Sequence, residues 1–122
     1  MSPANPSDDV VYKIVTRAAW RTAERAGAFR GAGVDLVDGY IHFSTADQAA
    51  ETAARHFAGQ DDLLLVAVSA EALGPALRYE PARNGALFPH LHGELPLSAV
   101  IRVQTLPLGA GGRHRFPDDF PG

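Results

Sequence analysis

The sequence predicts a single compact α+β domain, with a mixed or antiparallel β-sheet and two main helices. Short runs of β-branched and aromatic residues recur along the chain, and such runs are typical of strands. The strands predicted in this way outnumber the helices, and both helices fall in the first half of the chain. Since 122 residues is an ordinary length for one domain, we expect a disordered lead-in over residues 1–9, a folded domain over residues 10–108 and a loosely ordered tail over residues 109–122.

The first strand and the first helix are predicted from residues 10–27. Residues 10–15, VVYKIV, are β-branched and aromatic, which favours a strand. Thr16 can then cap a helix over the residues that follow, and Gly27 supplies the left-handed conformation at which helices commonly end. The glycine-rich stretch after it, residues 28–39, is predicted to be a loop with at most a short turn.

A second strand and a second helix are predicted from residues 40–59. Residues 40–43, YIHF, form a short apolar run that is typical of a buried strand. Thr45 followed by Gln48 fits a capping box, in which the two side chains satisfy backbone N–H groups at the start of a helix. Alanines then recur at helical spacing up to Gly59, so this helix can lie close against a sheet.

The second half of the chain is predicted to consist mainly of strands. Residues 62–68, DLLLVAV, form an apolar run that suits a central strand covered on both faces. A short helical turn begins at Ser69, and two short strands, residues 77–80 and 86–93, flank the turn PARNG. Residues 99–108 are predicted to be the last strand. As an edge strand it could pair with a second copy of the chain, but the sequence does not determine the oligomeric state.

The composition excludes several classes of protein. A net charge of −3 gives no electrostatic basis for a dedicated nucleic-acid groove. Cysteine is absent, which excludes disulfides, thiol catalysis and cysteine-ligated zinc. The N-terminal residues do not form a secretory signal, and no apolar run approaches the roughly 20 residues that a membrane span requires. We therefore expect a cytoplasmic protein that is not bound to a membrane. A small-molecule or nucleotide ligand stays open as a partner, because it needs only a local basic pocket.

Two polar clusters could form a site. In an extended strand, Tyr40, His42 and Ser44 share one face, while the residues between them point into the core. In the segment FPHLHG, His90 and His92 likewise share a face. One alternative is that these histidines are structural and simply hydrogen-bonded, and another is that the three histidines ligate a metal ion.

A third group of candidates is cationic. Lys13, Arg78 and Arg83 could form a small anion pocket if their strands adjoin. The alternative for each is a solvated charge or an ion pair, for instance between an arginine and Glu80.

The motifs YKIV, DGYIHFST, LLLVAV, LRYEP and FPHLHG occur in this order, together with Trp20 and a helix that carries Gln48 and Thr52. In this combination the chain resembles the small bacterial proteins grouped as domain of unknown function 952. The resemblance covers roughly residues 11–108 and brings no assigned reaction.

The resemblance implies a more distant relationship to the ADP-ribosyltransferase fold, near the RNA 2′-phosphotransferases. Through it, His42 and Ser44 correspond to residues that line an NAD pocket, with Tyr40 beside them. The resemblance further implies that His90 donates to a phosphate or acts as an acid or base, and an imidazole is suited to either role. Arg83 and Lys13 would clamp phosphate. The implied ligand is NAD or a nucleotide or RNA phosphate.

The sequence departs from that fold in two places. Lys13 stands where the transferases carry a histidine, and no counterpart of their glutamate-bearing segment is found. These departures favour a second interpretation, in which the chain is a ligand-binding module without catalysis. A metal-dependent enzyme built on His42, His90 and His92 is the third.

Overall fold

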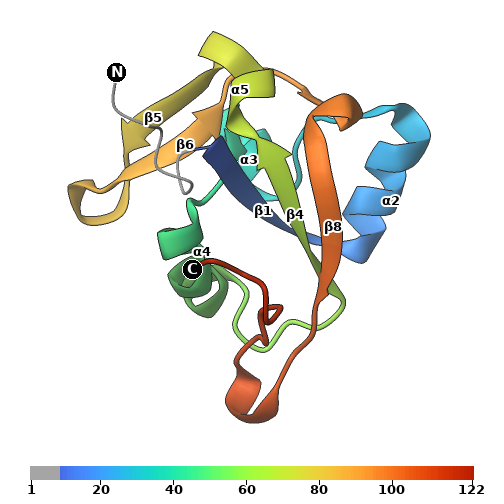
Figure 1. Ribbon diagram of the computed structural model, residues 1–122, viewed down its shortest axis with the longest axis vertical. Helices are drawn as coiled ribbons and strands as arrows, with labels where there is room; N and C mark the ends of the chain where they lie inside the picture. The colour runs from blue at the N-terminus through green and yellow to red at the C-terminus, as the bar shows by residue number, and fades with distance from the viewer. Residues whose placement is uncertain (1–8) are drawn as a thin grey trace.

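Three antiparallel strands form the central sheet, in the order β1–β4–β8 (Figure 1). Their bounds are Val10–Thr16 for β1, Leu63–Ser69 for β4 and Val100–Leu106 for β8. The computed structural model describes residues 9–122, and of Arg83 it describes only the backbone. The predicted central position of the strand DLLLVAV is confirmed, because β4 pairs with a neighbour on each side.

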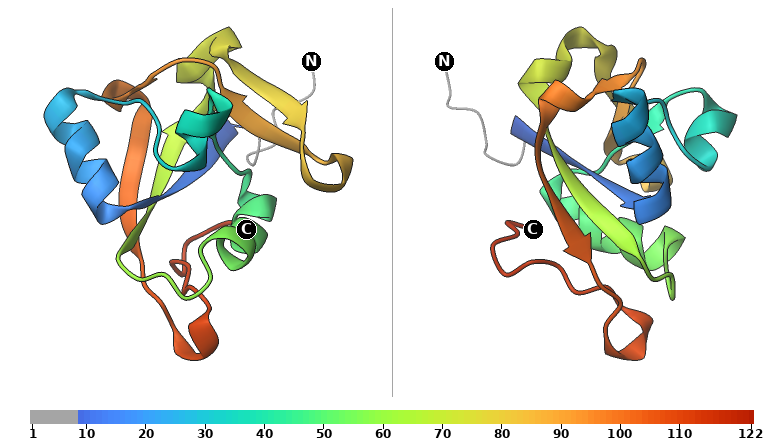
Figure 2. Two further views of the ribbon diagram at one scale, coloured as in Figure 1. Left: turned by 180° about the vertical axis from the view of Figure 1, so that it is seen from behind. Right: turned by 90° about the vertical axis from the view of Figure 1, so that its right-hand side faces the viewer.

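Hydrophobic residues fill both faces of this sheet. From β4, the side chains of Leu64, Val66 and Val68 enter one core cluster, and the residues between them enter a second cluster on the opposite face. Helix α2, Arg17–Ala26, closes the first cluster and helix α4, Ala46–His56, closes the second (Figure 2). The chain is thus an α+β domain with two main helices, as predicted.

A second antiparallel sheet lies beside the first, in the order β3–β6–β5. Its strands are β3 at Ile41–His42, β6 at Leu87–Leu91 and β5 at Leu77–Pro81. An isolated bridge between Tyr12 and Ser44 ties β1 to the end of β3. The bridge brings the second sheet against the edge of β1.

The helix ends follow the sequence signals closely. Thr16 caps α2 by accepting a hydrogen bond from the Ala19 N–H, and Gly27 ends the helix in the left-handed conformation. At α4 the capping box of Thr45 and Gln48 is present. The prediction that α4 continues to Gly59 is wrong, because the helix ends at His56 and the chain turns at Phe57.

Residues 28–39 contain more structure than the predicted loop. Ala28–Phe29 form β2, which pairs with β7 at Leu95–Pro96. Val34–Asp38 form the short helix α3, which ends at Gly39 with a φ of 84°. The many glycines obscured this helix in the sequence, although they stand at its two ends rather than inside it.

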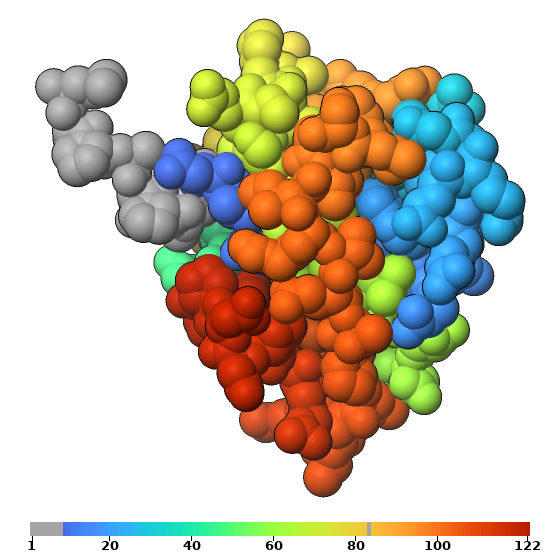
Figure 3. Space-filling model, turned by 45° about the vertical axis from the view of Figure 1, so that its right-hand side comes forward, coloured from blue at the N-terminus to red at the C-terminus, as the bar shows by residue number. Residues whose placement is uncertain are grey.

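The remaining elements are short. They are α5 at Ala70–Leu73 and the 3-10 turns η1 at Gly74–Ala76, η2 at Arg83–Gly85, η3 at Leu97–Ala99 and η4 at Ala110–Gly112. The segment after residue 108 lies beside β8 (Figure 3). Its Phe116 and Phe120 pack against the second core cluster, and Phe120 meets the Tyr12 ring edge-on at 4.9 Å. The division into a domain over residues 10–108 and a tail stays a prediction, and most of the predicted lead-in, residues 1–8, lies outside the described residues.

Candidate functional site

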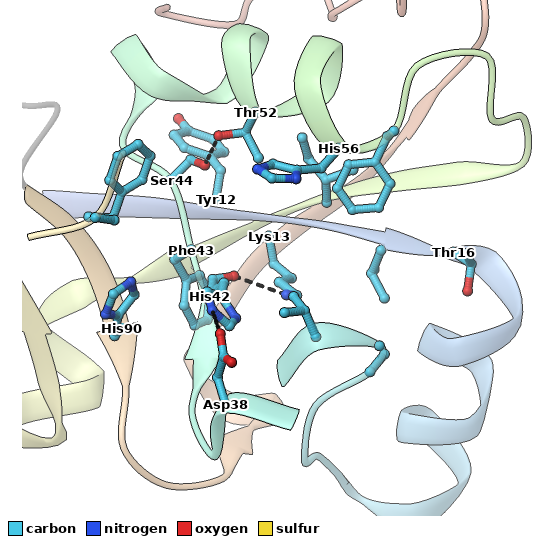
Figure 4. Close-up of a pocket in the computed structure, with 18 of the residues that line it drawn as sticks. Tyr12, Lys13, Thr16, Asp38, His42, Phe43, Ser44, Thr52, His56 and His90 are labelled. Carbon is cyan, nitrogen blue, oxygen red and sulfur yellow. Dashed lines mark hydrogen bonds and ion pairs between the residues drawn. The ribbon is translucent and has the colours of Figure 1, made fainter. Parts of the chain in front are cut away.

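A cavity of about 590 Å³ opens between the edge of β1, helices α3 and α4, and the second sheet (Figure 4). Pockets that bind small molecules usually measure about 300–1,000 Å³, so the volume suits a ligand. Four of the candidate residues line this cavity, namely Lys13, His42, Ser44 and His90. The structure therefore places them together, while their roles in binding and catalysis stay predictions.

Lys13 and Asp35 form a buried ion pair at one wall of the cavity. The Lys13 Nζ lies 2.9 Å from Asp35 Oδ2 and 3.1 Å from Oδ1, and it donates to the His42 carbonyl at 3.0 Å. Lys13 is 7% exposed and Asp35 only 2%. Protein acceptors thus hold the ammonium group, so a direct contact between Lys13 and phosphate would require this pair to open.

The burial of this pair shifts both ionisations. Removal from water lowers the pKa of Lys13, although the Asp35 carboxylate opposes that shift. Burial alone would raise the pKa of Asp35. Its hydrogen bond from His42 and the Lys13 charge outweigh burial and lower that pKa to about 2.

His42 is held between two carboxylates of α3. Its Nδ1 lies 2.6 Å from Asp35 Oδ1, and its Nε2 lies 2.9 Å from Asp38 Oδ2. The backbone N–H of His42 also donates to Asp35. Since a carboxylate only accepts, the protonated ring satisfies both partners at once, whereas the neutral ring can donate to just one. His42 is consequently fixed in orientation, with both ring nitrogens engaged.

Tyr40 lies at the centre of a cluster of imidazole rings. Its ring stacks on His90 with the centroids 4.3 Å apart, and it contacts the rings of His42 at 4.7 Å and His92 at 5.2 Å. Aromatic pairs at such distances stabilise each other beyond their buried area. The pKa of Tyr40 is raised by desolvation and by the nearby charges of Asp38 and Glu80. Tyr40 therefore contacts all three imidazoles and is not among the residues that line the cavity.

His90 shares a carboxylate oxygen with His92. Glu80 Oε1 lies 2.9 Å from His90 Nδ1 and 2.7 Å from His92 Nε2. These two hydrogen bonds lower the pKa of Glu80. His90 is 3% exposed and lines the cavity, and no described residue forms a hydrogen bond with its Nε2. Of the two cluster histidines that line the cavity, His42 has both ring nitrogens engaged, so His90 is the one with a ring nitrogen left for a ligand.

Ser44 lies on the α4 side of the cavity, away from the imidazole cluster. Its Oγ forms a hydrogen bond of 2.8 Å with the hydroxyl of Thr52 on α4. Ser44 is 3% exposed, and its backbone pairs with Tyr12. The sequence predicts that Tyr40, His42 and Ser44 leave the strand on one face, but Figure 4 shows the Ser44 side chain on the α4 side of β1 and the His42 side chain on the other side.

At the edge of β1, the backbone N–H and C=O of Ile14 face the cavity. Both the N–H and the C=O of Tyr12 are bonded to Ser44, so they point away from β4. In an antiparallel ladder, backbone directions alternate along the strand, which directs the N–H and C=O of Ile14 to the same side. No described residue pairs with β1 there, and Ile14 lines the cavity. A ligand can therefore meet one donor and one acceptor side by side.

The arginine candidates lie around the turn between β5 and β6. Arg78 stands opposite His90 in the register, so its exposed side chain leaves the same face of the sheet. Arg83 follows Ala82, a residue that lines the cavity, but the Arg83 side chain lies outside the described part of the chain. Its predicted phosphate contact stays a prediction.

The arrangement does not support a metal centre built on the three histidines. Among the described residues, no group of three or more His, Asp and Glu side chains is placed to hold a metal ion. Carboxylates already occupy four of the six ring nitrogens of these histidines. Asp35 and Asp38 contact the two nitrogens of His42, and Glu80 contacts one nitrogen each of His90 and His92.

Two acidic residues of the site were missed in the sequence. Asp35 and Asp38 stand three apart in VDLVD, a spacing that places them on one face of a helix. The glycines of residues 28–39 predict a loop, which masks this spacing. The sequence suggests Glu80 only as a partner for arginine, whereas the structure pairs it with His90 and His92.

The family described as "Protein of unknown function (DUF952)" matches residues 14–103. The chain belongs to the DUF952 family. The chain is similar to the crystal structure of protein CC0527 from Caulobacter crescentus. The two are 49% identical with a TM-score of 0.84, and the match covers 87% of this chain and 93% of CC0527. The solution NMR structure of the same protein is 50% identical, with a TM-score of 0.77 and coverage of 85% and 90%. No curated protein matches this chain.

The DUF952 assignment confirms the family predicted from the motif order, while the match brings no activity with it. None of the helices in residues 9–122 is both long enough and apolar enough to cross a membrane. The cytoplasmic location stays a prediction.

Proposed function

We propose that the cavity binds NAD or a related nucleotide and that His90 exchanges a proton with the bound molecule. The observation that carries the proposal is the placement of His90. It is a buried imidazole with Nδ1 held by Glu80, and it lines a cavity of ligand size. A general acid or base needs such a fixed orientation and a ring nitrogen within reach of the ligand.

The open edge at Ile14 supports an amide-bearing ligand. A carboxamide carries an N–H donor beside a C=O acceptor, which is the complement of the Ile14 backbone pair. NAD carries such a group on its nicotinamide ring. The apolar part of the cavity, which includes Phe43, Phe57 and Phe88, would accommodate a planar ring.

The remaining candidates have supporting roles in this proposal. His42 and Ser44 would contact the ribose or the nicotinamide, with Tyr40 holding the imidazoles in place. Arg83 would clamp phosphate at the rim, and Lys13 would fix the His42 backbone. The ADP-ribosyltransferase-like fold implied by the sequence resemblance belongs to the same proposal.

The proposed chemistry is an attack on the anomeric carbon of the nicotinamide ribose. An external hydroxyl group forms the new bond to that carbon, and the bond to the nicotinamide nitrogen breaks with its electron pair leaving on nicotinamide. His90 Nε2 accepts the proton of the attacking hydroxyl. No covalent intermediate on the protein is required.

The test is an NMR titration with three ligands, NAD, its carboxylic-acid analogue and ADP-ribose. We expect saturable shifts at Ile14 and His90 with NAD, and weaker binding of the carboxylic acid, which offers no N–H to the Ile14 carbonyl. His90→Gln should reduce nicotinamide release at least tenfold, while Glu24→Gln on the exposed face of α2 should leave it unchanged. The absence of shifts at millimolar concentrations of all three ligands would refute the proposal.

A second candidate is a ligand-binding module without catalysis. It is favoured because Asp35 already forms hydrogen bonds with both Lys13 and His42, which limits the contact of these two side chains with a ligand. This candidate predicts the same NMR shifts with no nicotinamide released. Release that depends on His90 would exclude it.

A further inference from the structure

One carboxylate oxygen of Glu80 accepts hydrogen bonds from two histidines that are buried to different extents. The His90 side chain is 4% exposed, whereas His92 is 31% exposed and Glu80 36%. A carboxylate can only accept, so both histidines must donate to it. The proton of neutral His90 is therefore on Nδ1, and that of neutral His92 is on Nε2.

Strand geometry fixes this arrangement. Glu80 on β5 pairs in register with Phe88, and Arg78 pairs with His90, so Glu80 lies diagonally across from His90 on the same face. His92 follows two residues later, and its backbone N–H donates to the Ala76 carbonyl, which extends the ladder beyond β6.

The other groups around His90 do not compete for its Nδ1. They are Tyr40 and His42 at β3, Arg78 on β5 and Lys13 across the cavity on β1. Tyr40 stacks on the ring face, and the His42 ring meets it edge-on at 5.4 Å. Among the described residues, only Glu80 accepts a hydrogen bond from the His90 ring.

We infer that Glu80 is the positioning residue of this site: it fixes His90 with its proton on Nδ1 and leaves Nε2 as the atom that meets the ligand. This inference rests on the proposed function only in naming the ligand-facing atom. His92 supports this positioning, because its own hydrogen bond to Glu80 helps to hold the carboxylate beside His90. The contact resembles the way in which a carboxylate selects the tautomer of a histidine base in other enzymes.

The test reads the tautomer directly. Two-bond proton–nitrogen NMR of ¹⁵N-labelled protein, recorded well above pH 7, distinguishes a protonated Nδ1 from a protonated Nε2 in each neutral histidine. We expect wild-type His90 to carry its proton on Nδ1. Glu80→Ala should shift His90 toward the Nε2–H form, whereas Glu80→Gln should retain the Nδ1–H form, because its amide oxygen still accepts.

Two controls separate tautomer selection from general loosening. Glu94→Ala removes an exposed carboxylate that pairs with Arg30, and it should leave His90 unchanged. His92→Ala should also preserve the His90 tautomer, since Glu80 remains. An Nε2–H form in the wild type, or an unchanged Nδ1–H form in Glu80→Ala, would overturn the inference.

The same spectra keep the two proposals apart. Addition of ADP-ribose should move the His90 Nε2 signal if the proposed function is correct. If the wild-type tautomer is Nδ1–H and that signal never moves with NAD, its acid analogue or ADP-ribose, the proposed function fails while the role of Glu80 stands.

Discussion

The Lys13 ammonium lies 2.9 Å from the Asp35 carboxylate, with both side chains buried although 22 positions separate them in the sequence. The pair joins β1 to α3, and the same carboxylate orients His42. It is therefore both a structural contact and part of one wall of the cavity.

Breaking this pair should destabilise the protein strongly. Lys13→Met leaves a buried carboxylate without its cation, and Asp35→Asn leaves a buried ammonium without its anion. We expect either substitution to lower the free energy of unfolding by about 3–5 kcal/mol, and the double variant to cost less than the sum. Urea unfolding measures the effect.

The exposed pair of Arg30 and Glu94 provides the matched control. Glu94→Gln should change the free energy of unfolding by no more than about 1 kcal/mol. Equal effects for the buried and the exposed pair would contradict the assigned role of Lys13 and Asp35.

Stability should fall in acid through Asp35. Its pKa in the folded protein is about 2, below the ordinary value of 3.8, so the folded state binds its proton more weakly than the unfolded state does. The resulting stabilisation is complete above about pH 5 and is lost as the pH falls toward 2. We expect Asp35 to contribute about 2 kcal/mol to the free energy of unfolding. The wild-type protein should lose this amount between about pH 5 and pH 2, and Asp35→Asn should not.

Carboxyl-carbon NMR of the wild-type protein reports the same ionisation without any substitution. An Asp35 signal that titrates near pH 4 would contradict the expected acid dependence.

The hydroxyls of Ser44 and Thr52 should depend on each other. Ser44→Ala leaves the Thr52 hydroxyl without its partner, and we expect a loss of about 1 kcal/mol in the free energy of unfolding. The double variant Ser44→Ala with Thr52→Val removes both groups and should recover part of that loss. Additive effects in a thermal or urea cycle would show that the two hydroxyls act separately.

The C-terminal segment should add to stability through Phe120. Phe120 contacts Tyr12 edge-on and packs against the second core cluster. We therefore expect Phe120→Ala to lower the free energy of unfolding by about 1–2 kcal/mol. Phe120→Leu keeps an apolar side chain and should cost less. Unchanged unfolding for both variants would favour the loosely ordered tail that the sequence predicts.

Much of the fold could be predicted because its signals are local. Residues 63–68 are apolar on both faces and lie at the centre of the sheet, and the caps at Thr16 and Thr45 set the starts of α2 and α4. Strand alternation also placed Ile41 and Phe43 in the core, where they are 1% and 3% exposed. These features depend only on residues that are close together in the sequence.

Helix α3 could not be predicted in the same way, because its pattern is inverted. Its apolar residues face outward, with exposures of 57% for Val34, 68% for Leu36 and 83% for Val37. Asp35 between them is buried, which hydropathy alone would not indicate. The reason lies elsewhere in the chain, in the Lys13 and His42 groups that bind this carboxylate.

The sequence by itself thus determined the family, the α+β class, the helix caps and the face on which His42 stands. Only the tertiary structure decided how the polar residues combine. It pairs Lys13 with Asp35, clamps both nitrogens of His42 and leaves Nε2 of His90 without a partner among the described residues. Propensity and periodicity act between near neighbours, whereas these charges meet across strands and helices that are distant in sequence. Their chemistry is fixed by which partner folding places beside each of them.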